Sequence, residues 1–548
     1  MSDVHSLWMA AAGGGTASIP APQIEYGQLS PMLIVFGAAV LGILAEAFLP
    51  RRLRWGTQVT LALAGLAAAF VAVLVLANDG YGTTKSGLIA MGSVALDGPA
   101  LFLQGVILLA GVLAVLLYAE RRLDPRVDGV PLDAFTAQGA AAPGGEQEKQ
   151  AAKAGFASTE VYPLTLFAIG GMLLFPAAND LLTMFVALEV FSLPLYLLCA
   201  LARRRRLLSQ EAAVKYFLLG SFASAFFLFG SALLYGYAGS FRLPDIHDVI
   251  AGTAPATPAL ASSTQNDVLL LVGLAMVAVG LFFKVGAVPF HSWTPDVYQG
   301  APTPVTGFMA AATKVAAFGA LLRLFYVAFP GLRWDWRPVM WAVAILTMVV
   351  GAILAVTQQD VKRLLAYSSI AHAGFILTGV IASNRQGVGA VLFYLLAYTF
   401  VTLGAFAVVT LVRDSKGEAT HLSSWAGLGR RSPLLAAVFA LFLLSFAGIP
   451  LTAGFTGKFA VFQAAAAGGA TPLVIIGVLS SAVAAFFYIR VIVLMFFSDP
   501  QPNGPAVAIP SAFTSTAISL GVIATVGLGV LPQYFLDLAS KAAMFSGH

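Results

Sequence analysis

Five ionisable side chains lie inside apolar stretches of this 548-residue sequence, at Glu189, Lys215, Lys284, Lys314 and Lys458. A charge in such a stretch is energetically unfavourable, and it usually marks an ion or proton pathway. Desolvation disfavours the charged form of an amine, whereas a nearby carboxylate favours it. Movement of the carboxylate therefore makes a lysine take up or release a proton. The five residues therefore predict a proton relay. Their spacing does not indicate which lysine pairs with the glutamate.

Several of these candidates have a second interpretation. Lys215 lies near the end of its apolar stretch, so its ammonium is able to reach the headgroup region. Glu189 is either the counter-charge of a buried lysine or a neutral carboxyl held by a local hydrogen bond. His291 and His372 are candidates for proton transfer, although a lone histidine inside a span is more often a structural hydrogen-bonding residue.

Composition indicates the elements that must position these residues. Hydrophobic residues make up 59% of the chain and charged residues only 10%, against roughly 45–50% and 25% in soluble domains. This excludes a soluble fold and predicts an all-α polytopic membrane protein with about 14 transmembrane helices. The apolar stretches lie at 31–49, 57–77, 98–118, 161–177, 181–202, 211–237, 268–290, 303–329, 338–356, 361–382, 386–412, 433–466, 471–497 and 511–535.

The basic residues predict the orientation of these spans. If Arg51 lies inside, 18 of the 30 lysines and arginines lie on the inner side, six on the outer side and six within spans. The positive-inside rule then places both termini on the outer side. We expect residues 1–30 to form a loose arm without the basic region of a signal peptide, and residues 124–160 to form a low-complexity inner loop.

An internal repeat is visible in the spans. Residues 213–230 align with 390–407, and 303–318 align with 471–486, so spans four to eight repeat as nine to thirteen. An odd number of helices inverts the second copy, which predicts two inverted five-helix repeats. The predicted divisions are 1–160 (arm, three helices and loop), 161–330 and 338–497 (the repeats) and 498–548 (the last helix).

Each repeat contains a span with proline and glycine near its middle. These are KVGAVPFHSW at 284–293 and GIPLTAGFTGKF at 448–459. Such residues free backbone groups that lipid cannot satisfy, so they predict two broken helices that line an ion path.

Absent motifs and residue types exclude several kinds of chemistry. The sequence has no phosphate-binding loop, no dinucleotide fingerprint after a strand and no zinc helix motif. Its only cysteine, Cys199, excludes disulfides within the chain and cysteine-ligated metal clusters. We therefore expect no cofactor or metal in this chain and no nucleic-acid partner, with the driving force supplied by a partner or an ion gradient.

Three segments resemble the antiporter-like membrane subunits of respiratory complex I, NADH-quinone oxidoreductase. They are FKVGAVPFHSWTPDVYQGAPTPVTGFMAAATKVAAF (283–318), QDVKRLLAYSSIAHAGF (359–375) and GIPLTAGFTGKF (448–459), and the resemblance extends over about residues 161–497. It implies a fourteen-helix core with two inverted five-helix units. It also implies that Glu189 pairs with Lys284, that Lys314 is the central lysine and that Lys458 is the terminal one.

The family contains three homologous subunits. One typically has a glutamate where Lys458 stands, and another carries a long lateral helix after its last span. This chain has the lysine and ends at His548, about a dozen residues after its last predicted span, which favours the third subunit.

The resemblance implies a proton-translocating subunit of a bacterial plasma membrane. NADH, flavin, iron–sulfur clusters and quinone are then expected in partner subunits, and sister antiporter-like subunits are expected as neighbours. Two alternatives stay open: a subunit of a multi-subunit cation/proton antiporter, and a structural subunit that retains charged spans without pumping.

Overall fold

The computed structural model describes residues 22, 24–123, 133–136, 145–147, 150, 158–253, 267–414, 417–501 and 504–546. The predicted arm (1–30) and the predicted inner loop (124–160) lie largely outside these residues.

Helices form most of the described chain. Twelve are long and apolar enough to cross a membrane, and two shorter apolar helices lie at Val161–Ala177 and Pro433–Ala447. All fourteen coincide with apolar stretches of the sequence, which confirms the predicted all-α polytopic fold. The α-helices are α2 (Ser30–Phe48), α3 (Arg51–Asn78), α4 (Gly98–Tyr118), α6 (Val161–Leu174), α7 (Leu181–Cys199), α8 (Arg206–Ala238), α9 (Leu243–Ile250), α10 (Asp267–Val285), α11 (Trp293–Gly300), α12 (Thr303–Phe308), α13 (Lys314–Arg323), α14 (Arg333–Thr357), α15 (Val361–Ile381), α16 (Arg385–Leu411), α17 (Leu428–Arg431), α18 (Pro433–Ala447), α19 (Ala453–Ala467), α20 (Thr471–Phe497), α21 (Ala512–Val530) and α22 (Gln533–Lys541).

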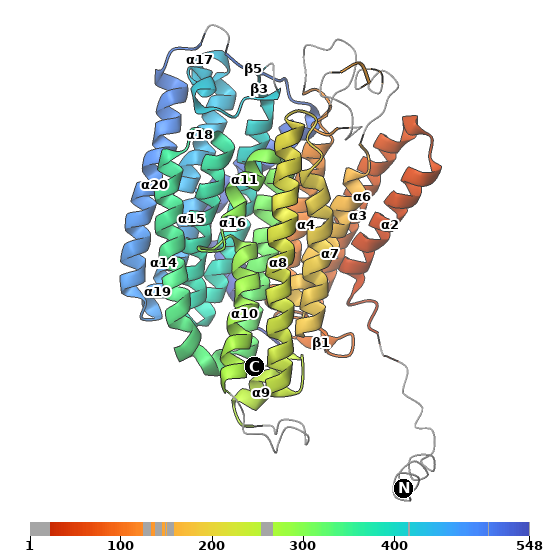
Figure 1. Ribbon diagram of the computed structural model, residues 1–548, viewed down its shortest axis with the longest axis vertical. Helices are drawn as coiled ribbons and strands as arrows, with labels where there is room; N and C mark the ends of the chain where they lie inside the picture. Colours follow the sequence, from red (N-terminus) through yellow and green to blue (C-terminus); the bar gives the residue numbers. More distant parts are fainter. Residues whose placement is uncertain are drawn as a thin grey trace, which may run out of the picture.

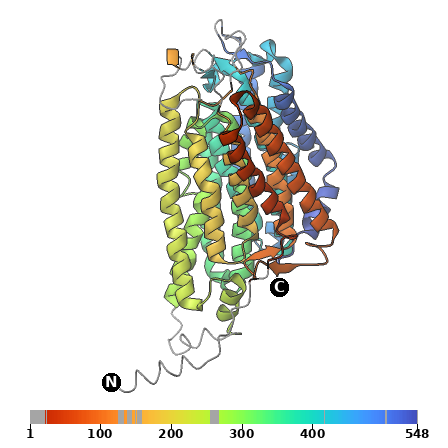
Figure 2. The same ribbon diagram turned by 90° about the vertical axis from the view of Figure 1, so that its right-hand side faces the viewer.

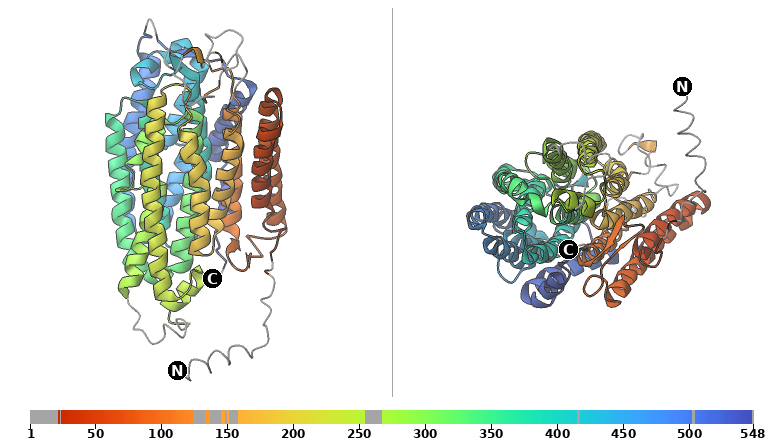
Figure 3. Two further views of the ribbon diagram at one scale, coloured as in Figure 1. Left: turned by 45° about the vertical axis from the view of Figure 1, so that its right-hand side comes forward. Right: turned by 90° about the horizontal axis from the view of Figure 1, so that it is seen from below.

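The spanning helices stand side by side along the long axis of the molecule, and the connections gather at its two ends (Figures 1 and 2). Helices α15 and α16 and the segment Thr303–Ala328 are almost completely enclosed by protein, whereas α2, α3 and α21 expose most of their surface. The view from below shows this arrangement, with α2 and α3 in red and the C-terminal helices in dark blue at the rim (Figure 3). Two of these three enclosed segments carry Lys314 and His372.

Two spans are broken, as the sequence predicts. The first stops at Val285 and restarts at Trp293, and the second stops at Ala447 and restarts at Ala453. Gly286 and Gly448 follow the first halves with φ of +74° and +83°, a conformation that favours glycine. Along the chain α11 lies above α10, whereas α19 lies below α18 (Figure 1). The two broken helices therefore run in opposite directions, as an inverted repeat requires.

The span that carries Lys314 is continuous but not uniformly α-helical. A π-helical turn, η2 (Met309–Thr313), separates α12 from α13, and a second one, η3 (Leu324–Ala328), follows α13. Such turns interrupt the regular hydrogen-bond ladder and occur frequently at functional sites.

Short strands extend the loops at both ends. Strands β1 (Gly87–Ile89) and β2 (Val94–Leu96) form a hairpin, and β3 (Val412–Asp414) pairs with β4 (Gly417–Glu418) and β5 (Ala506–Val507) at the other end (Figure 1). These strands give no signal in the sequence, because two or three residues are too few to show an alternating pattern.

Candidate functional site

Lys314 is the first residue of α13, directly after the η2 turn. Its side chain is buried, and its ammonium donates to the carbonyl oxygens of Ser369 at 2.7 Å and Val285 at 3.2 Å. The last carbonyls of a helix have no partner within that helix. Because Val285 ends α10, Lys314 satisfies a carbonyl that the helix break leaves free. The ammonium also lies 5.6 Å from the ring centre of Tyr398.

Lys284 lies one residue before the end of α10 and is held by neutral groups. Its ammonium donates to the hydroxyl of Ser192 at 2.7 Å and lies 5.2 Å from the ring centre of Phe191 and 5.4 Å from that of Tyr216. Ring faces attract a desolvated cation. The side chain is therefore enclosed by rings and one hydroxyl.

Glu189 precedes Ser192 by three residues on α7, so both side chains lie on one face of that helix. One of its carboxylate oxygens is buried and has no hydrogen-bond partner. The resemblance implies a Glu189–Lys284 pair, but the ion pairs found among the described residues do not include one. Instead the hydroxyl of Ser192 contacts the lysine, one helical turn from the carboxylate.

Lys458, on α19, closes the second helix break. Its ammonium donates to the carbonyl oxygens of Phe446 at 2.8 Å and Ala447 at 3.0 Å, and to the hydroxyl of Ser481 at 2.8 Å. The C-terminal end of a helix carries partial negative charge, which a cation stabilises. Both broken helices thus have a buried lysine ammonium on the carbonyls that precede the break.

His372, on α15, shares one aromatic neighbour with Lys314 and another with Lys458. Its ring contacts those of Tyr398 and Phe375, with centre-to-centre distances of 5.3 Å and 5.7 Å. Lys314 lies over the ring of Tyr398, and Lys458 lies 4.9 Å from the ring centre of Phe375. One aromatic ring therefore contacts both the imidazole and Lys314, and another contacts both the imidazole and Lys458.

The polar partners of His372 are hydroxyl groups. Its Nδ1 atom lies 2.6 Å from the hydroxyl of Tyr394, and its Nε2 atom lies 3.4 Å from that of Tyr488, which also contacts the hydroxyl of Ser368. A small cavity beside the imidazole is lined by Tyr394, Tyr398 and the start of α19 and has room for about one water molecule. Both ring nitrogens therefore face groups that donate or accept protons.

The acceptors around the three buried lysines share one property, which is that they are uncharged. No ion pair among the described residues includes Lys284, Lys314 or Lys458. Neutral acceptors bind an ammonium less strongly than a carboxylate does, so these sites suit a proton that must move. Within the same residues, no group of His, Cys, Asp and Glu side chains is arranged to hold a metal ion.

Among the described residues, neither Lys215 nor His291 forms a hydrogen bond or an ion pair with these three lysines. Lys215 is partly exposed, and its ammonium pairs with Glu211 and Asp296, each at 2.7 Å. Asp296 also pairs with Arg363 at 2.6 Å. His291 lies in the break after α10, half-buried, with an Nδ1 atom that has no hydrogen-bond partner. Lys215 therefore belongs to an ionic cluster that links α8, α11 and α15.

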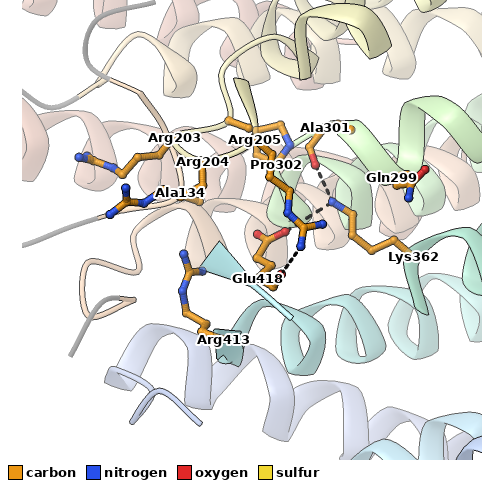
Figure 4. Close-up of a pocket in the computed structure, with 12 residues that line it drawn as sticks. Ala134, Arg203, Arg204, Arg205, Gln299, Ala301, Pro302, Lys362, Arg413 and Glu418 are labelled. Atoms are coloured by element: carbon orange, nitrogen blue, oxygen red, sulfur yellow. Dashed lines mark hydrogen bonds and ion pairs between the residues drawn. The ribbon is translucent and has the colours of Figure 1, made fainter. Parts of the chain in front are cut away.

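Lys362 is a buried cation, although the charge pattern of the sequence predicts it in an inner loop. It lies in the first turn of α15, donates to the carbonyl of Ala301 at 2.6 Å and lies 3.5 Å from the carboxylate of Glu418 (Figure 4). Thr303, which begins the span of Lys314, donates to the same carboxylate. The Glu418–Lys362 pair thus anchors this span at one end of the bundle.

The carboxylate of Glu418 lies outside the spanning helices, and its cationic surroundings keep it ionised. Burial raises its pKa, but Lys362, Arg413 and hydrogen bonds from Thr303 lower the pKa by more, so the pKa lies below the ordinary value of a glutamate. Arg205 donates to the backbone carbonyl of Glu418 at 3.1 Å and reinforces the same junction (Figure 4).

Sequence reasoning missed the hydroxyl partners of the site, which are Ser192, Ser481, Tyr394 and Tyr488. Serine and tyrosine are frequent in apolar helices, so their type alone is not a signal. The spacing of Ser192 from Glu189 was a usable signal, because residues three apart share a helix face. The partners of Lys458 and His372 come from other helices, and no spacing in the sequence reveals them.

Comparison with known proteins places the chain in a family. Residues 178–484 match the family model described as "NADH:quinone oxidoreductase/Mrp antiporter, TM". The chain is 69% identical over 547 residues to NADH-quinone oxidoreductase subunit N 3 of Streptomyces griseus subsp. griseus, with 99% of each chain covered. It is 66% identical over 544 residues to NADH-quinone oxidoreductase subunit N of Rhodococcus opacus, covering 97% of this chain and 98% of the relative.

Solved structures share its architecture. A chain of respiratory complex I from Thermus thermophilus with bound aureothin is 34% identical, with a TM-score of 0.71, 93% of this chain covered and 99% of that one. A chain of the Mrp complex from Dietzia sp. is 22% identical, with a TM-score of 0.75, 95% of this chain covered and 97% of that one. The second likeness shows a shared fold only.

The relatives also decide among the three homologous subunits. Lys458 favours the third of them, and the two relatives described above bear the name of subunit N. The chain belongs to the subunit N family of NADH-quinone oxidoreductase.

Proposed function

We propose that this chain translocates protons within NADH-quinone oxidoreductase through a relay of Glu189, Lys284, Lys314, His372 and Lys458. The observation that carries the proposal is the position of His372, which shares one aromatic neighbour with Lys314 and another with Lys458. Its two ring nitrogens are able to take up a proton on one side and release one on the other. Three lysines held by neutral acceptors then exchange protons without breaking an ion pair.

In this mechanism the carboxylate of Glu189 controls the relay. When its charge acts on Lys284, the ammonium form of that lysine is favoured, and when the carboxylate moves away the lysine releases its proton. Lys314 contacts the carbonyl of Val285, next to Lys284, and is the next residue to carry the proton. A proton that leaves the Lys314 ammonium reaches one nitrogen of His372 by way of the tyrosine hydroxyl that contacts that nitrogen. The other nitrogen releases a proton through its own hydroxyl partner toward Lys458, so charge is conserved at every transfer.

We place Lys215 and His291 at the edge of this relay. The Lys215 ammonium is partly exposed and paired with Asp296, which suits exchange of protons with the surroundings. His291 has a buried nitrogen without a partner beside the first helix break. Both residues then serve proton access, whereas transfer between the lysines depends on the enclosed residues.

The driving force comes from outside the chain in this proposal. NADH, flavin, iron–sulfur clusters and quinone are bound by partner subunits, and sister antiporter-like subunits are the membrane neighbours. The whole assembly lies in a bacterial plasma membrane with both termini of this chain on the outer side. We further propose that residues 161–330 and 338–497 act as two inverted halves, with Lys284 and Lys314 in the first half and Lys458 in the second.

The decisive experiment replaces the central lysine. Membranes that carry Lys314→Ala are assayed for NADH-driven proton pumping and quinone reduction, with assembly of the complex checked by native electrophoresis. We expect an assembled complex in which both activities fall together, because pumping and quinone reduction are coupled. Arg333→Ala, which removes an exposed cation, should leave both activities unchanged.

Other outcomes distinguish the alternatives. Unchanged pumping in assembled Lys314→Ala membranes would overturn the relay and indicate a structural subunit. Sodium-dependent proton movement in the absence of NADH would indicate a cation/proton antiporter instead.

A further inference from the structure

An apolar groove lies in the bundle, and none of its lining residues belongs to the candidate relay. It has a volume of about 260 Å³ and lies between α3, α4, α16 and α22. Its walls include Phe70, Phe102, Leu396, Phe535 and Leu538. Seen from below, α3 and the C-terminal helices lie next to each other on this side of the molecule (Figure 3). The groove is separate from the candidate relay.

The length of the groove matches one leaflet of a bilayer. Along α4 its wall extends from Gly98, beside the turn that contains Tyr81, to Leu109. At 1.5 Å per residue this is about 16 Å, whereas the hydrocarbon core of a bilayer is about 30 Å thick. A helix of a partner subunit would cross both leaflets. The groove ends near the middle of the membrane and therefore suits an acyl chain.

The mouth of the groove carries positive charge. Lys85 lies in the turn that lines it, Lys541 lies at the end of α22, and Arg385 donates to a backbone carbonyl of α22 at 3.2 Å. These are three of the six basic residues that the sequence places on the outer side. The same elements carry two carboxylates, Asp79 and Asp537, so the formal charge at the mouth is +1 (three minus two).

Helix α22 has the character of an interfacial helix. It is nine residues long, and its exposed positions combine Tyr534 and Leu538 with Lys541. Aromatic and apolar residues with a lysine are typical of helices that lie at the level of the headgroups. The helix thus forms one wall of the groove and also presents a cation at its mouth.

We propose that the groove binds one acyl chain of an anionic phospholipid whose phosphate group lies against Lys85 and Lys541. The apolar walls hold the chain along one leaflet, and the two ammonium groups select a headgroup with a net negative charge. A basic residue near a membrane surface attracts anionic lipids. Lys85 and Lys541 together should therefore bind an anionic headgroup more strongly than a zwitterionic one.

The test uses the whole complex in vesicles. One preparation contains a photoactivatable phosphatidylglycerol in phosphatidylcholine, and the other contains a photoactivatable phosphatidylcholine in the same lipid. After illumination, the labelled peptides of this chain are identified by mass spectrometry. In the unmodified complex we expect phosphatidylglycerol to label the peptides of α4 and α22 about tenfold more than phosphatidylcholine does.

Two kinds of variant test the acyl-chain site and the headgroup site separately. A Cβ atom at Gly105 would lie 3.7 Å from its nearest neighbour, Phe70, so Gly105→Leu fits locally and fills the groove. It should abolish labelling by both lipids at α4, whereas Gly37→Leu, at an exposed position of α2 with open space around it, should not. Lys85→Gln with Lys541→Gln should remove the preference for phosphatidylglycerol, whereas Arg333→Gln should retain it.

Equal labelling of α4 and α22 by both lipids in the unmodified complex would overturn the proposal, because it would indicate unselective surrounding lipid. Unchanged labelling in Gly105→Leu would overturn it too, as would crosslinks from the groove to another subunit. If Gly105→Leu does not assemble, the double variant Lys85→Gln, Lys541→Gln decides the question. An unchanged preference for phosphatidylglycerol in that variant would then reject the headgroup site.

Discussion

The Nδ1 atom of His372 lies 2.6 Å from the hydroxyl oxygen of Tyr394. Its other ring nitrogen lies 3.4 Å from the hydroxyl of Tyr488. A hydroxyl both donates and accepts hydrogen bonds, so this imidazole keeps polar partners with one proton or with two. A carboxylate partner would favour the doubly protonated ring, whereas two hydroxyls leave it able to change its state.

The first prediction concerns His372→Gln. Glutamine keeps a donor and an acceptor in the same cavity but does not bind a proton at neutral pH. We expect NADH-driven proton pumping in inverted membrane vesicles to fall by about tenfold or more, since positioned proton-transfer groups commonly contribute 10²-fold or more to a rate. Assembly should persist.

His421→Gln is the matched control for this experiment. His421 is exposed, precedes a short helical turn at one end of the bundle and contacts the hydroxyl of Ser423. Its replacement should leave pumping unchanged. Equal pumping rates in the two variants would show that His372 transfers no proton.

The second prediction concerns the hydroxyl between Glu189 and Lys284. Ser192→Ala removes the hydrogen-bond acceptor of the Lys284 ammonium. Leaving a buried polar group without its partner costs about 1–3 kcal/mol of stability. We expect severalfold slower pumping, measured in the same vesicles, because the proton occupancy of Lys284 changes.

Ser231→Ala controls for the loss of a buried serine. Ser231 donates to the carbonyl of Phe227 one turn earlier, as Ser192 does to that of Leu188, but it has no lysine partner among the hydrogen bonds of the described residues. The Ser231→Ala complex should pump protons at the rate of the unmodified complex. A similar decrease in both variants would mean that the effect is structural.

The sequence predicted the spans because each one satisfies its own backbone hydrogen bonds and needs only length and apolar composition. Both helix breaks were predictable for a related reason, since proline and glycine act locally on the backbone. The candidate lysines were visible because a charge in hydrocarbon is unfavourable wherever it lies. These properties belong to single segments.

What the sequence did not reveal depends on contacts between segments. Lys314 donates to a carbonyl of α15, and His372 contacts hydroxyls from α16 and α20. Arg323 was visible only as a charge inside a span, because its partner Asp97 lies 226 positions away. The π-helical turn before Lys314 was equally hidden, since its local sequence, MAAAT, favours an ordinary α-helix.

The third prediction uses the glycine at the second helix break. Gly448 has φ of +83°, and a Cβ atom there would lie 3.1 Å from Cδ of Lys458. Gly448→Ala should therefore destabilise the chain by about 1–2 kcal/mol for the backbone conformation and also displace the Lys458 side chain. We expect slower proton pumping although every charge is retained.

Gly469→Ala separates these two effects. Gly469 has φ of +77° with open space around it, so alanine there meets the same backbone strain without touching a lysine. A modest decrease in thermal stability with normal pumping is expected. If both glycine variants pump normally, the exact placement of Lys458 does not matter for transfer.

The fourth prediction concerns pH and Glu418. Its pKa in the folded chain lies below the ordinary value, so the pair with Lys362 stabilises the structure at neutral pH and loses this contribution as the pH falls through the folded pKa. At about pH 7, the Glu418→Gln complex should melt at a lower temperature than the unmodified complex. When the pH is lowered to about 4, the melting temperature of the variant should decrease by less than that of the unmodified complex. Thermal melting of the purified complex checks both. Parallel pH profiles for the two proteins would contradict the prediction.

The fifth prediction concerns the buried pair of Asp97 and Arg323. The guanidinium donates to the two carboxylate oxygens at 2.7 and 2.9 Å, and both side chains are fully buried. Removing one partner of such a pair leaves the other charge buried without compensation, at about 3–5 kcal/mol. Asp97 also accepts from the backbone N–H of Ala100 and Ser546. Asp97→Asn should therefore prevent stable assembly of this chain, detected as loss of the complex on native electrophoresis.

Asp499→Asn provides the comparison that decides whether burial is the cause. Asp499 pairs with Arg430 at 2.7 Å, the same distance, but both side chains are largely exposed. Surface pairs contribute about 0–1 kcal/mol, so this variant should assemble and melt like the unmodified complex. If Asp97→Asn also assembles normally, the surroundings of Arg323 must supply another acceptor. If both variants fail to assemble, the charge at either end is needed for contacts between subunits, and burial of the Asp97–Arg323 pair does not explain the loss.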